Sequence, residues 1–284
     1  MATLRAVRKR IKSAKNIQQI TKAMKMVSAA KLKKAQERIL AARPYAEKIR
    51  EVISELIGRA DPEAYPILAE NKSANREALV LVTSDKGLCG SYNTNLIKEA
   101  IKRMRENPDL SIYFIGKKGM DVMKKFGKEL ELFKYNDKNI AWDDVEQVCG
   151  LLMKNFTAGK YRKADLIYSE FQNSLAQKVV TKPLLPVKFE QAGGPAPARD
   201  FLYEPGEHAV LQDLLLRYVK TTVYRAIFEA QAAEHGVRMV SMEMATNNAG
   251  EMIRSLTLLA NKTRQAAITK EILEIVGGAE AIKG

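Results

Sequence analysis

One ten-residue turn carries the side chains that come nearest to a small-molecule site. The segment Ser84–Asn93 (Ser-Asp-Lys-Gly-Leu-Cys-Gly-Ser-Tyr-Asn) follows an apolar run and opens a helical pattern, the place where α/β folds bind phosphate groups. Its glycines match neither the G-x-G-x-x-G pattern nor the G-x-x-x-x-G-K-[ST] phosphate loop. Gly87 and Gly90 are better explained by a tight turn between strand and helix. We therefore predict no nucleotide or other cofactor in this chain.

Side chains suited to catalysis or metal binding are scarce. The chain holds only two His and two Cys in 284 residues, and Cys89 and Cys149 form neither a CxxC pair nor a cluster with His208 or His235. A Ser/His/Asp grouping, an HExxH pattern and a convincing acidic pair are also missing from the sequence. We predict no catalytic residue, no metal site and no redox control, with both thiols free and buried.

Basic residues are concentrated at one end of the chain. The formal net charge is +14 at pH 7. Residues 1–59 hold 16 Lys and Arg against 4 Asp and Glu, whereas residues 206–284 hold 9 of each kind. No acidic residue precedes Glu37. The basic segment therefore needs an anionic neighbour.

Three explanations fit this basic segment: a solvated coiled-coil face, an acidic protein partner, or nucleic acid. Its first aromatic residue is Tyr45, so it lacks the interleaved rings on which single-stranded nucleic acids stack. We favour the acidic protein. A transit peptide is also basic and acid-poor, but the apolar pattern continues unbroken from Ala23 to Ile39, so we expect the segment to belong to the mature fold.

The N-terminal segment is predicted to form one helix from about residue 3 to residue 57, about 80 Å long at 1.5 Å per residue. Its apolar residues recur every three or four positions, near the 3.5-residue period of a coiled coil. They are Leu4, Val7, Ile11, Ala14, Ile17, Ile20, Met24 and Val27. Pro44 should bend or divide the helix, because proline removes a backbone hydrogen bond and restricts Arg43.

The C-terminal segment repeats this pattern over a greater length. Between His208 and Val276 there is no proline, the apolar positions have helical spacing, and Gly277 and Gly278 are expected to end the helix. Two long helices with one apolar stripe each most simply pair as an antiparallel coiled coil. The second helix is longer by about 15–20 residues, so about 25–30 Å of it should lack a partner within this chain.

Between the two helices the hydrophobic period becomes that of β-strands. Strand-like runs at 78–84, 111–116, 164–169 and 178–187 alternate with helical stretches at 93–106, 117–127 and 142–159. This alternation predicts a mostly parallel sheet covered on both faces, with a linker at Ala192–Pro197. The predicted fold class is α/β: a long antiparallel coiled coil of N- and C-terminal helices plus a central Rossmann-like α/β domain. We assign residues 1–58 and 207–284 to the coiled coil and residues 76–190 to the central domain.

The C-terminal motif Ile268–Ala281 resembles the C-terminal signature of the γ subunit of F-type ATP synthases. Other co-linear segments are similar to the same family, so the resemblance covers the whole chain. They are Ile20–Lys31, Ser84–Gly90, Leu202–Pro205, Arg238–Met242, Ala245–Ala249 and Asn261–Thr269.

The resemblance implies a central rotor shaft of the F1Fo ATP synthase. The coiled coil would turn inside a ring of three α and three β subunits, and the α/β domain would form a foot against the ε subunit and the c ring. Rotation would couple proton or sodium flow through the c ring to ATP synthesis or hydrolysis on the β subunits. The chain itself would be a non-catalytic subunit with no small-molecule substrate. Its link to the membrane would be indirect, at the cytoplasmic face of a bacterial inner membrane.

The same resemblance implies three groups of contact residues. Lys22, Met24 and Lys25 would face acidic lever loops of the β subunits. Arg264, Gln265 and Thr269 would meet a loop of one β subunit near the middle of the ring. Phe201, Tyr203 and Glu204 fall where the foot approaches ε and the c ring, although Phe201 replaces the more usual tyrosine.

Two rival hypotheses belong to other functional classes. A basic coiled-coil adaptor that binds nucleic acid or an acidic partner predicts an affinity for any duplex that falls steeply with salt. A nucleotide-binding enzyme that uses the Ser84–Asn93 turn predicts ATP binding by the isolated chain.

Overall fold

The computed structural model describes residues 3–57, 64–126, 130–134, 136, 142–173, 177–189, 203–204 and 206–283. The predicted linker Ala192–Pro197 and Phe201 lie outside these residues. The chain divides into two compact units. One unit joins Met1–Ser28 to Met239–Gly284, and the other is Ala29–Arg238. Each is described by itself.

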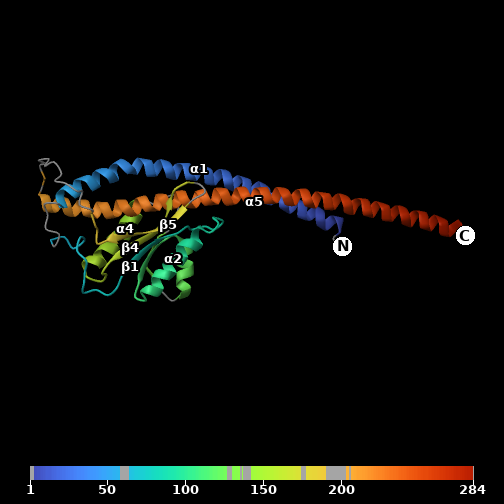
Figure 1. Cartoon of the computed structure of the whole chain (residues 1–284). Helices are drawn as coiled ribbons and strands as arrows, with labels where there is room; N and C mark the ends of the chain where they lie inside the picture. Colours follow the sequence, from blue (N-terminus) through green and yellow to red (C-terminus); the bar gives the residue numbers. More distant parts are fainter. Residues whose placement is uncertain are drawn as a thin grey trace. The chain divides into compact units, whose positions relative to one another are not determined.

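Two long helices, α1 (Leu4–Ile57) and α5 (Glu207–Lys283), contribute to both units (Figure 1). Their lengths agree with the sequence prediction. Pro44, expected to bend or divide the first helix, lies inside α1 and does not divide it. The expected helix end at Gly277 and Gly278 is wrong. The helix α5 continues through Gly277 and Gly278 to Lys283. Glycine costs only about 1 kcal/mol in a helix interior, so without a capping arrangement it does not end one.

Within the unit formed by the two chain ends, α1 and α5 run antiparallel. The Nζ atom of Lys25 lies 2.7 Å from Oε1 of Glu243, and the hydroxyls of Thr21 and Thr246 are also 2.7 Å apart. Advancing along α1 therefore means going backward along α5, and the antiparallel pairing predicted from the two apolar stripes is confirmed in this unit.

The buried seam of α1 in this unit differs from the predicted stripe. The buried residues recur at every seventh position, as a coiled coil requires: they are Val7, Ala14, Thr21 and Ser28. Ile17, Ile20 and Val27, which the spacing assigned to the stripe, are more than half exposed. Thr21 and Ser28 are polar, so the apolar spacing assigned their neighbours Ile20 and Val27 to the buried stripe in their place.

The C-terminal end of α5 carries no intramolecular cover. All residues from Arg264 to Gly278 are exposed, and they include the apolar side chains of Ile268, Leu273 and Ile275. The prediction that the longer helix extends beyond its partner is therefore confirmed.

The second unit, Ala29–Arg238, contains a five-stranded sheet with the order β3-β2-β1-β4-β5. Strands β3, β2, β1 and β4 are parallel, and β5 joins β4 as an antiparallel edge strand. The strands are β1 (Ala78–Val82), β2 (Ser111–Ile115), β3 (Leu130–Lys134), β4 (Ala164–Phe171) and β5 (Gln177–Leu185). The mostly parallel sheet is confirmed, and β3 is an additional strand that the sequence analysis missed.

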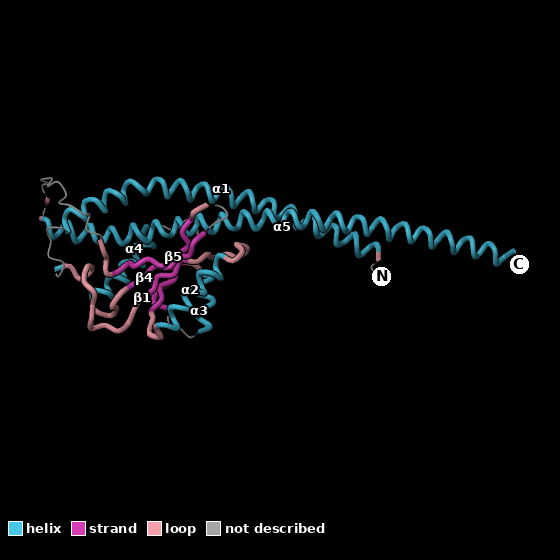
Figure 2. The backbone as a smooth tube through the Cα atoms, viewed as in Figure 1, coloured by secondary structure: helices cyan, strands magenta, loops and turns pink. Residues whose placement is uncertain are grey.

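Helices cover both faces of this sheet (Figure 2). The helices are α2 (Tyr92–Glu106), α3 (Lys117–Met123) with the short 3-10 helix η2 (Lys124–Phe126), and α4 (Trp142–Thr157). Side chains alternate along β1: Val80 and Val82 pack against α4 and α5, whereas Leu79 and Leu81 pack against α2 and α3. Continuous apolar strands are typical of a parallel sheet buried on both sides.

A third apolar cluster joins α1 to α5 inside the same unit. Ile49, Ile53 and Leu56 of α1 pack with Leu211 and Leu215 near the start of α5. The beginning of α5 therefore meets the end of α1, so the two helices are antiparallel here as well.

Candidate functional site

The first candidate surface is an open groove on the unit formed by the chain ends. It has a volume of about 380 Å³, and its lining is polar: Gln18, Gln19, Lys22 and Lys25 come from α1, and Glu243, Thr246 and Asn247 from α5. Of the three contact residues predicted on α1, Lys22 is exposed, Met24 is half-buried, and Lys25 is paired with Glu243. Lys22 and Lys25 therefore line the groove, whereas Met24 is not one of its lining residues.

Hydroxyl groups make this part of the helical pair polar inside as well as outside. The Thr21 hydroxyl oxygen lies 3.1 Å from the carbonyl oxygen of Gln18, and the Thr246 hydroxyl oxygen lies 2.7 Å from that of Met242. The two hydroxyls also lie 2.7 Å apart, and one of them donates to the other. The sequence analysis did not identify Gln18, Gln19 or Glu243, because an exposed polar residue on a helix gives no local signal.

The second predicted group lies farther along α5. Arg264, Gln265 and Thr269 are all exposed, and the Thr269 hydroxyl donates to the carbonyl oxygen of Gln265 at 3.0 Å. Arg264 follows Glu243 by 21 positions, about 30 Å of helix at 1.5 Å per residue. The two predicted groups are therefore well separated, and Arg264, Gln265 and Thr269 lie on the exposed stretch of α5.

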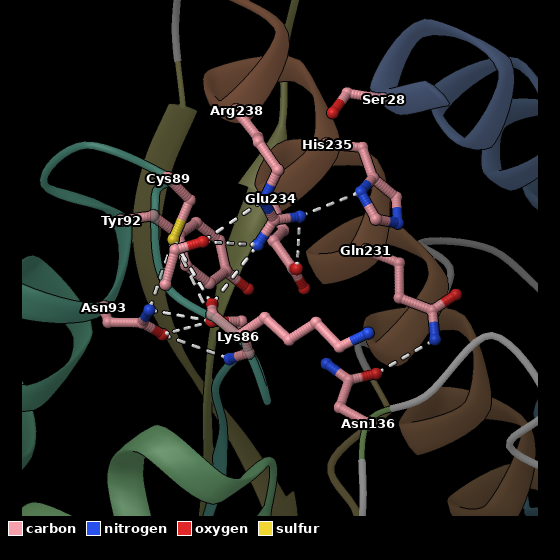
Figure 3. Close-up of polar contacts among 12 residues, drawn as sticks. Ser28, Lys86, Cys89, Tyr92, Asn93, Asn136, Gln231, Glu234, His235 and Arg238 are labelled. Atoms are coloured by element: carbon pink, nitrogen blue, oxygen red, sulfur yellow. Dashed lines mark hydrogen bonds and ion pairs between the residues drawn. The ribbon is translucent and has the colours of Figure 1, made fainter. Parts of the chain in front are cut away.

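The turn Ser84–Asn93 is closed by its own side chains (Figure 3). The Ser84 amide donates to Oδ1 of Asn93 at 3.1 Å, the Ser84 hydroxyl donates to the carbonyl oxygen of Lys86 at 2.7 Å, and Nδ2 of Asn93 lies 3.2 Å from Sγ of Cys89. A phosphate site needs unpaired backbone N–H groups that converge on an anion. Here the turn directs carbonyl oxygens toward a cation, Arg238, instead.

Arg238 of α5 is the buried cation at this turn. Its Nη2 atom donates to the carbonyl oxygens of Lys86 and Gly87, both at 3.2 Å, and its Nη1 atom lies 2.6 Å from Oε1 of Glu234. Arg238 and Glu234 are 7% and 5% exposed. Burial raises the pKa of Glu234, and the Arg238 charge opposes that rise.

His235 completes this cluster as a neutral acceptor. Nη1 of Arg238 lies 3.1 Å from Nδ1 of His235. Burial, together with the charges of Arg238 and Lys31, lowers the pKa of His235 to about 3. The ring is therefore uncharged near neutral pH, and its Nδ1 atom can accept a hydrogen bond from Arg238. Arg238 and Lys86 belong to separate motifs of the sequence, which gives no sign that they meet.

The cysteines occupy two separate buried positions. Both are free, as predicted, and burial raises the pKa of Cys149 to about 12 and that of Cys89 above its ordinary value. Over the described residues, no group of three or more metal-ligating side chains occurs. Within the same residues, no helix has the length and apolarity needed to cross a bilayer.

The third predicted group is described only in part. Tyr203 is half-buried and packs on the cluster that contains Ile53 and Leu211. Glu204 is exposed. Phe201 lies outside the described residues, so the structure leaves its predicted contact as a prediction.

Comparison with known proteins gives matches along the entire chain. The profile of a family described as ATP synthase matches residues 3–282. The ATP synthase gamma chain of Desulforamulus reducens is 42% identical over 284 residues, which cover 100% of both chains. The chain belongs to the ATP synthase gamma chain family. The gamma chain of Heliobacterium modesticaldum is 40% identical over 290 residues, covering 99% of this chain and 100% of that relative.

Chains from solved ATP synthase structures have the same fold. A chain from the central stalk and c-ring structure of Tetrahymena thermophila mitochondrial ATP synthase has a TM-score of 0.61 at 26% identity, covering 80% of this chain and 99% of that one. A chain from the rotor structure of the Euglena gracilis enzyme has a TM-score of 0.67 at 24% identity, covering 93% and 98%. The fold prediction is thus confirmed, and the comparisons give no support to a nucleic-acid adaptor.

Proposed function

We propose that this gamma-family chain is the central stalk subunit of an F1Fo ATP synthase, and that its rotation inside a ring of three α and three β subunits couples ion flow through the c ring to ATP synthesis or hydrolysis. The observation that carries the proposal is the match to gamma chains over the full length of both sequences. Catalysis would reside on the β subunits, and this chain would be a non-catalytic rotor.

The surface of the unit formed by the chain ends supports a role as a covered shaft. Met1–Ser28 contains eight Lys and Arg and no acidic residue. Between the described side chains of its two helices, Lys25–Glu243 is the one ion pair. Exposed Ile20 and Val27 lie among these cations. A surface that mixes basic and apolar side chains fits an acidic protein partner better than water.

The asymmetry of this surface supplies a mechanism. The α1 part of the unit is strongly basic, whereas Met239–Gly284 holds five basic and five acidic residues. Inside a threefold ring, such a pair of helices offers a different side to each β subunit and biases each toward a different conformation. Moving a two-state site from 1:99 to 99:1 needs about 5.5 kcal/mol of differential contact. Rotation would pass these states around the ring.

Contacts with the ring and the foot follow from the predicted groups. Lys22, Met24 and Lys25 would meet acidic lever loops of β, and the exposed stretch with Arg264, Gln265 and Thr269 would meet a β loop farther along. Phe201, Tyr203 and Glu204 would lie near ε and the c ring. In this division, residues 1–58 and 207–284 form the shaft and residues 76–190 the foot.

The cellular setting follows from the same proposal. The relatives described above are bacterial. The chain would lie at the cytoplasmic face of the inner membrane as a peripheral protein, held there by ε and the c ring.

Reconstitution with α and β subunits from the same source tests the shaft role. The chain should form a stable complex with three α and three β subunits and should confer ATP hydrolysis that depends on it. Arg264→Ala/Gln265→Ala should weaken assembly or turnover, because these exposed side chains would contact β. The matched control is Arg43→Ala/Glu47→Ala, which removes an exposed ion pair on α1 and should change neither quantity.

Two outcomes would contradict the proposal. One is a wild-type chain that stays separate from α and β subunits while binding duplex DNA or ATP alone. The other concerns the contact residues only: equal assembly and turnover for the double variant and its control would remove Arg264 and Gln265 from the interface.

A further inference from the structure

The crevice at the carboxyl end of β1 is occupied by the chain itself. Strand β1 lies between β2 and β4, where the sequential order of the strands reverses. Ligands of open α/β folds bind in the crevice outside such a position. In this chain, the Tyr92 hydroxyl and the backbone carbonyl oxygens of Lys86 and Gly87 meet α5 at that point (Figure 3).

Three hydrogen-bonded contacts connect the crevice to two turns of α5. The Tyr92 hydroxyl donates to the carbonyl oxygen of Ala230 at 3.1 Å. Nε2 of Gln231 donates to Oδ1 of Asn136 at 2.9 Å, and Arg238 donates to the carbonyl oxygens of Lys86 and Gly87. We call Tyr92, Asn136, Gln231 and Arg238 the crevice clamp.

The clamp is anchored in the sheet as well as in the helix. Nδ2 of Asn136 donates to the carbonyl oxygen of Thr83, the residue after β1, at 2.8 Å. The amide of Asn136 donates to Oδ1 of Asp85 at 3.1 Å. Gln231 is therefore linked through one buried side chain to the end of the central strand.

The apolar contact beside the clamp is made by small side chains. Ala226, Ala230 and Ala233 of α5 are at most 2% exposed and pack in the cores on either side of the sheet. Apolar burial is favourable but non-directional. Alanine side chains are short and interdigitate little with the sheet, so they oppose sliding or turning of the helix only weakly. Larger side chains of α5, Val219, Val223 and Ile227, are also buried in the core on one face of the sheet. The clamp adds hydrogen bonds to this packing, and because hydrogen bonds depend steeply on distance and angle, they restrain the rotational position of α5.

We propose that Arg238, supported by Gln231, is a positioning residue that locks α5 to the sheet and carries mechanical load between the α/β domain and the helix during rotation. This inference rests on the rotor function proposed above. Arg238 suits the task because its planar guanidinium holds two carbonyl oxygens and the Glu234 carboxylate at once.

The test uses the complete ATP synthase in sealed vesicles and compares ATP hydrolysis with ATP-driven ion pumping. Arg238→Lys keeps a cation beside Glu234, but a single ammonium group cannot reproduce the planar guanidinium that donates to two carbonyl oxygens and the Glu234 carboxylate at once. We expect hydrolysis at the wild-type rate and a loss of ions pumped per ATP. Amides in 84–93 should exchange with deuterium about tenfold faster, as expected for the loss of a charge-assisted hydrogen bond. The matched control is Arg217→Lys, at an exposed ion pair with Asp213 on the same helix.

The outcome for Arg238→Lys distinguishes a positioning role of Arg238 from a merely structural one. Pumping and exchange at wild-type levels in Arg238→Lys would overturn the inference, and so would a parallel fall in hydrolysis and pumping, since that indicates a merely structural residue. If Arg238→Lys does not assemble, Gln231→Leu, which breaks the link to Asn136, provides the same comparison. A wild-type chain that supports no pumping would instead refute the proposed rotor function.

Discussion

Replacing Gly116 by alanine should strongly destabilise the α/β domain. Gly116 follows β2 and has a φ of +105°, a conformation that residues with a side chain rarely adopt. A Cβ atom there would lie 2.1 Å from the carbonyl oxygen of Thr83 and 2.7 Å from its hydroxyl oxygen. The closest atom belongs to the backbone of the strand-end segment that also anchors Asn136, so it cannot move aside cheaply.

The expected loss combines two costs. An unfavourable backbone conformation costs about 1–3 kcal/mol, and forcing an extra carbon into a packed site costs about 1–3 kcal/mol more. Together these predict a decrease of about 2–6 kcal/mol in the free energy of unfolding. With a denaturant slope of about 1–3 kcal/mol per molar urea, the unfolding midpoint should fall by at least about 0.7 M.

The same substitution at Gly150 provides the matched control with the opposite sign. Gly150 lies inside α4, and a Cβ atom built there meets nothing within 4 Å. Gly150→Ala should therefore stabilise the domain by about 0.5–1 kcal/mol through helix propensity. Urea unfolding can be followed by the fluorescence of Trp142, the one tryptophan of the chain, which packs on Tyr224. Equal midpoints for Gly116→Ala and the wild type would refute the reasoning.

Three further predictions concern buried polar groups. Tyr113→Phe should lower the free energy of unfolding by about 1–2 kcal/mol, because the Tyr113 hydroxyl lies 3.1 Å from that of Tyr161 in the core; urea unfolding would detect it. Cys149 should resist iodoacetamide at pH 8 until the chain unfolds, because burial raises its pKa to about 12; mass spectrometry of the alkylated chain checks this, and labelling of the folded chain would contradict it. Burial opposes ionisation of Glu131, but hydrogen bonds from Lys160 and Ser111 together with the Lys160 charge outweigh it, so the carboxyl pKa lies below its ordinary 4.5. The ionised group stabilises the fold above about pH 4.5, so wild-type stability should fall more steeply on acidification below that pH than the stability of Glu131→Gln.

The sequence was sufficient to predict most of the fold because the central strands are buried on both faces. Runs such as Ala78–Val82 are continuously apolar, and a buried parallel strand must be. The missed strand β3 reads Leu-Glu-Leu-Phe-Lys. It is an edge strand, and residues 131–134 are only half-buried. Its polar residues Glu131 and Lys134 interrupt the apolar run that marks the central strands.

Element interruptions were harder to predict than elements. Pro44 and the pair Gly277 and Gly278 are unfavourable in helices by local preference, yet α1 and α5 run through them. Around Pro44 the local cost is a few kcal/mol, and the packing of the neighbouring part of α1 on α5 can exceed it. Gly277 and Gly278 lie on the exposed stretch of α5, where the helix continues because each glycine costs only about 1 kcal/mol. The seam shows the same limit, since Thr21 and Ser28 are buried because of the heptad position they occupy and not because of their polarity.

The predicted contact residues could be placed on elements but not related to one another. Lys22 and Lys25 both lie on α1, but the ion pair of Lys25 with Glu243 joins positions 218 residues apart. Arg238 and Lys86 are separated by 152 residues. Such pairs depend on how the whole chain folds, and no local spacing encodes them.

Cations in this chain therefore have two distinct physical roles. The basic side chains of Met1–Ser28 are largely exposed, where an ion pair contributes little to stability and is screened by salt; their charge remains available to a partner. Arg238 is buried. Its charge is paired with Glu234 and hydrogen-bonded to two carbonyl oxygens. If Arg238 moved away from these partners, it would leave an uncompensated buried charge. Because that is unfavourable, the contact resists displacement. A rotor needs both roles, because it must be recognised along its surface and must not slip where it joins its own domain.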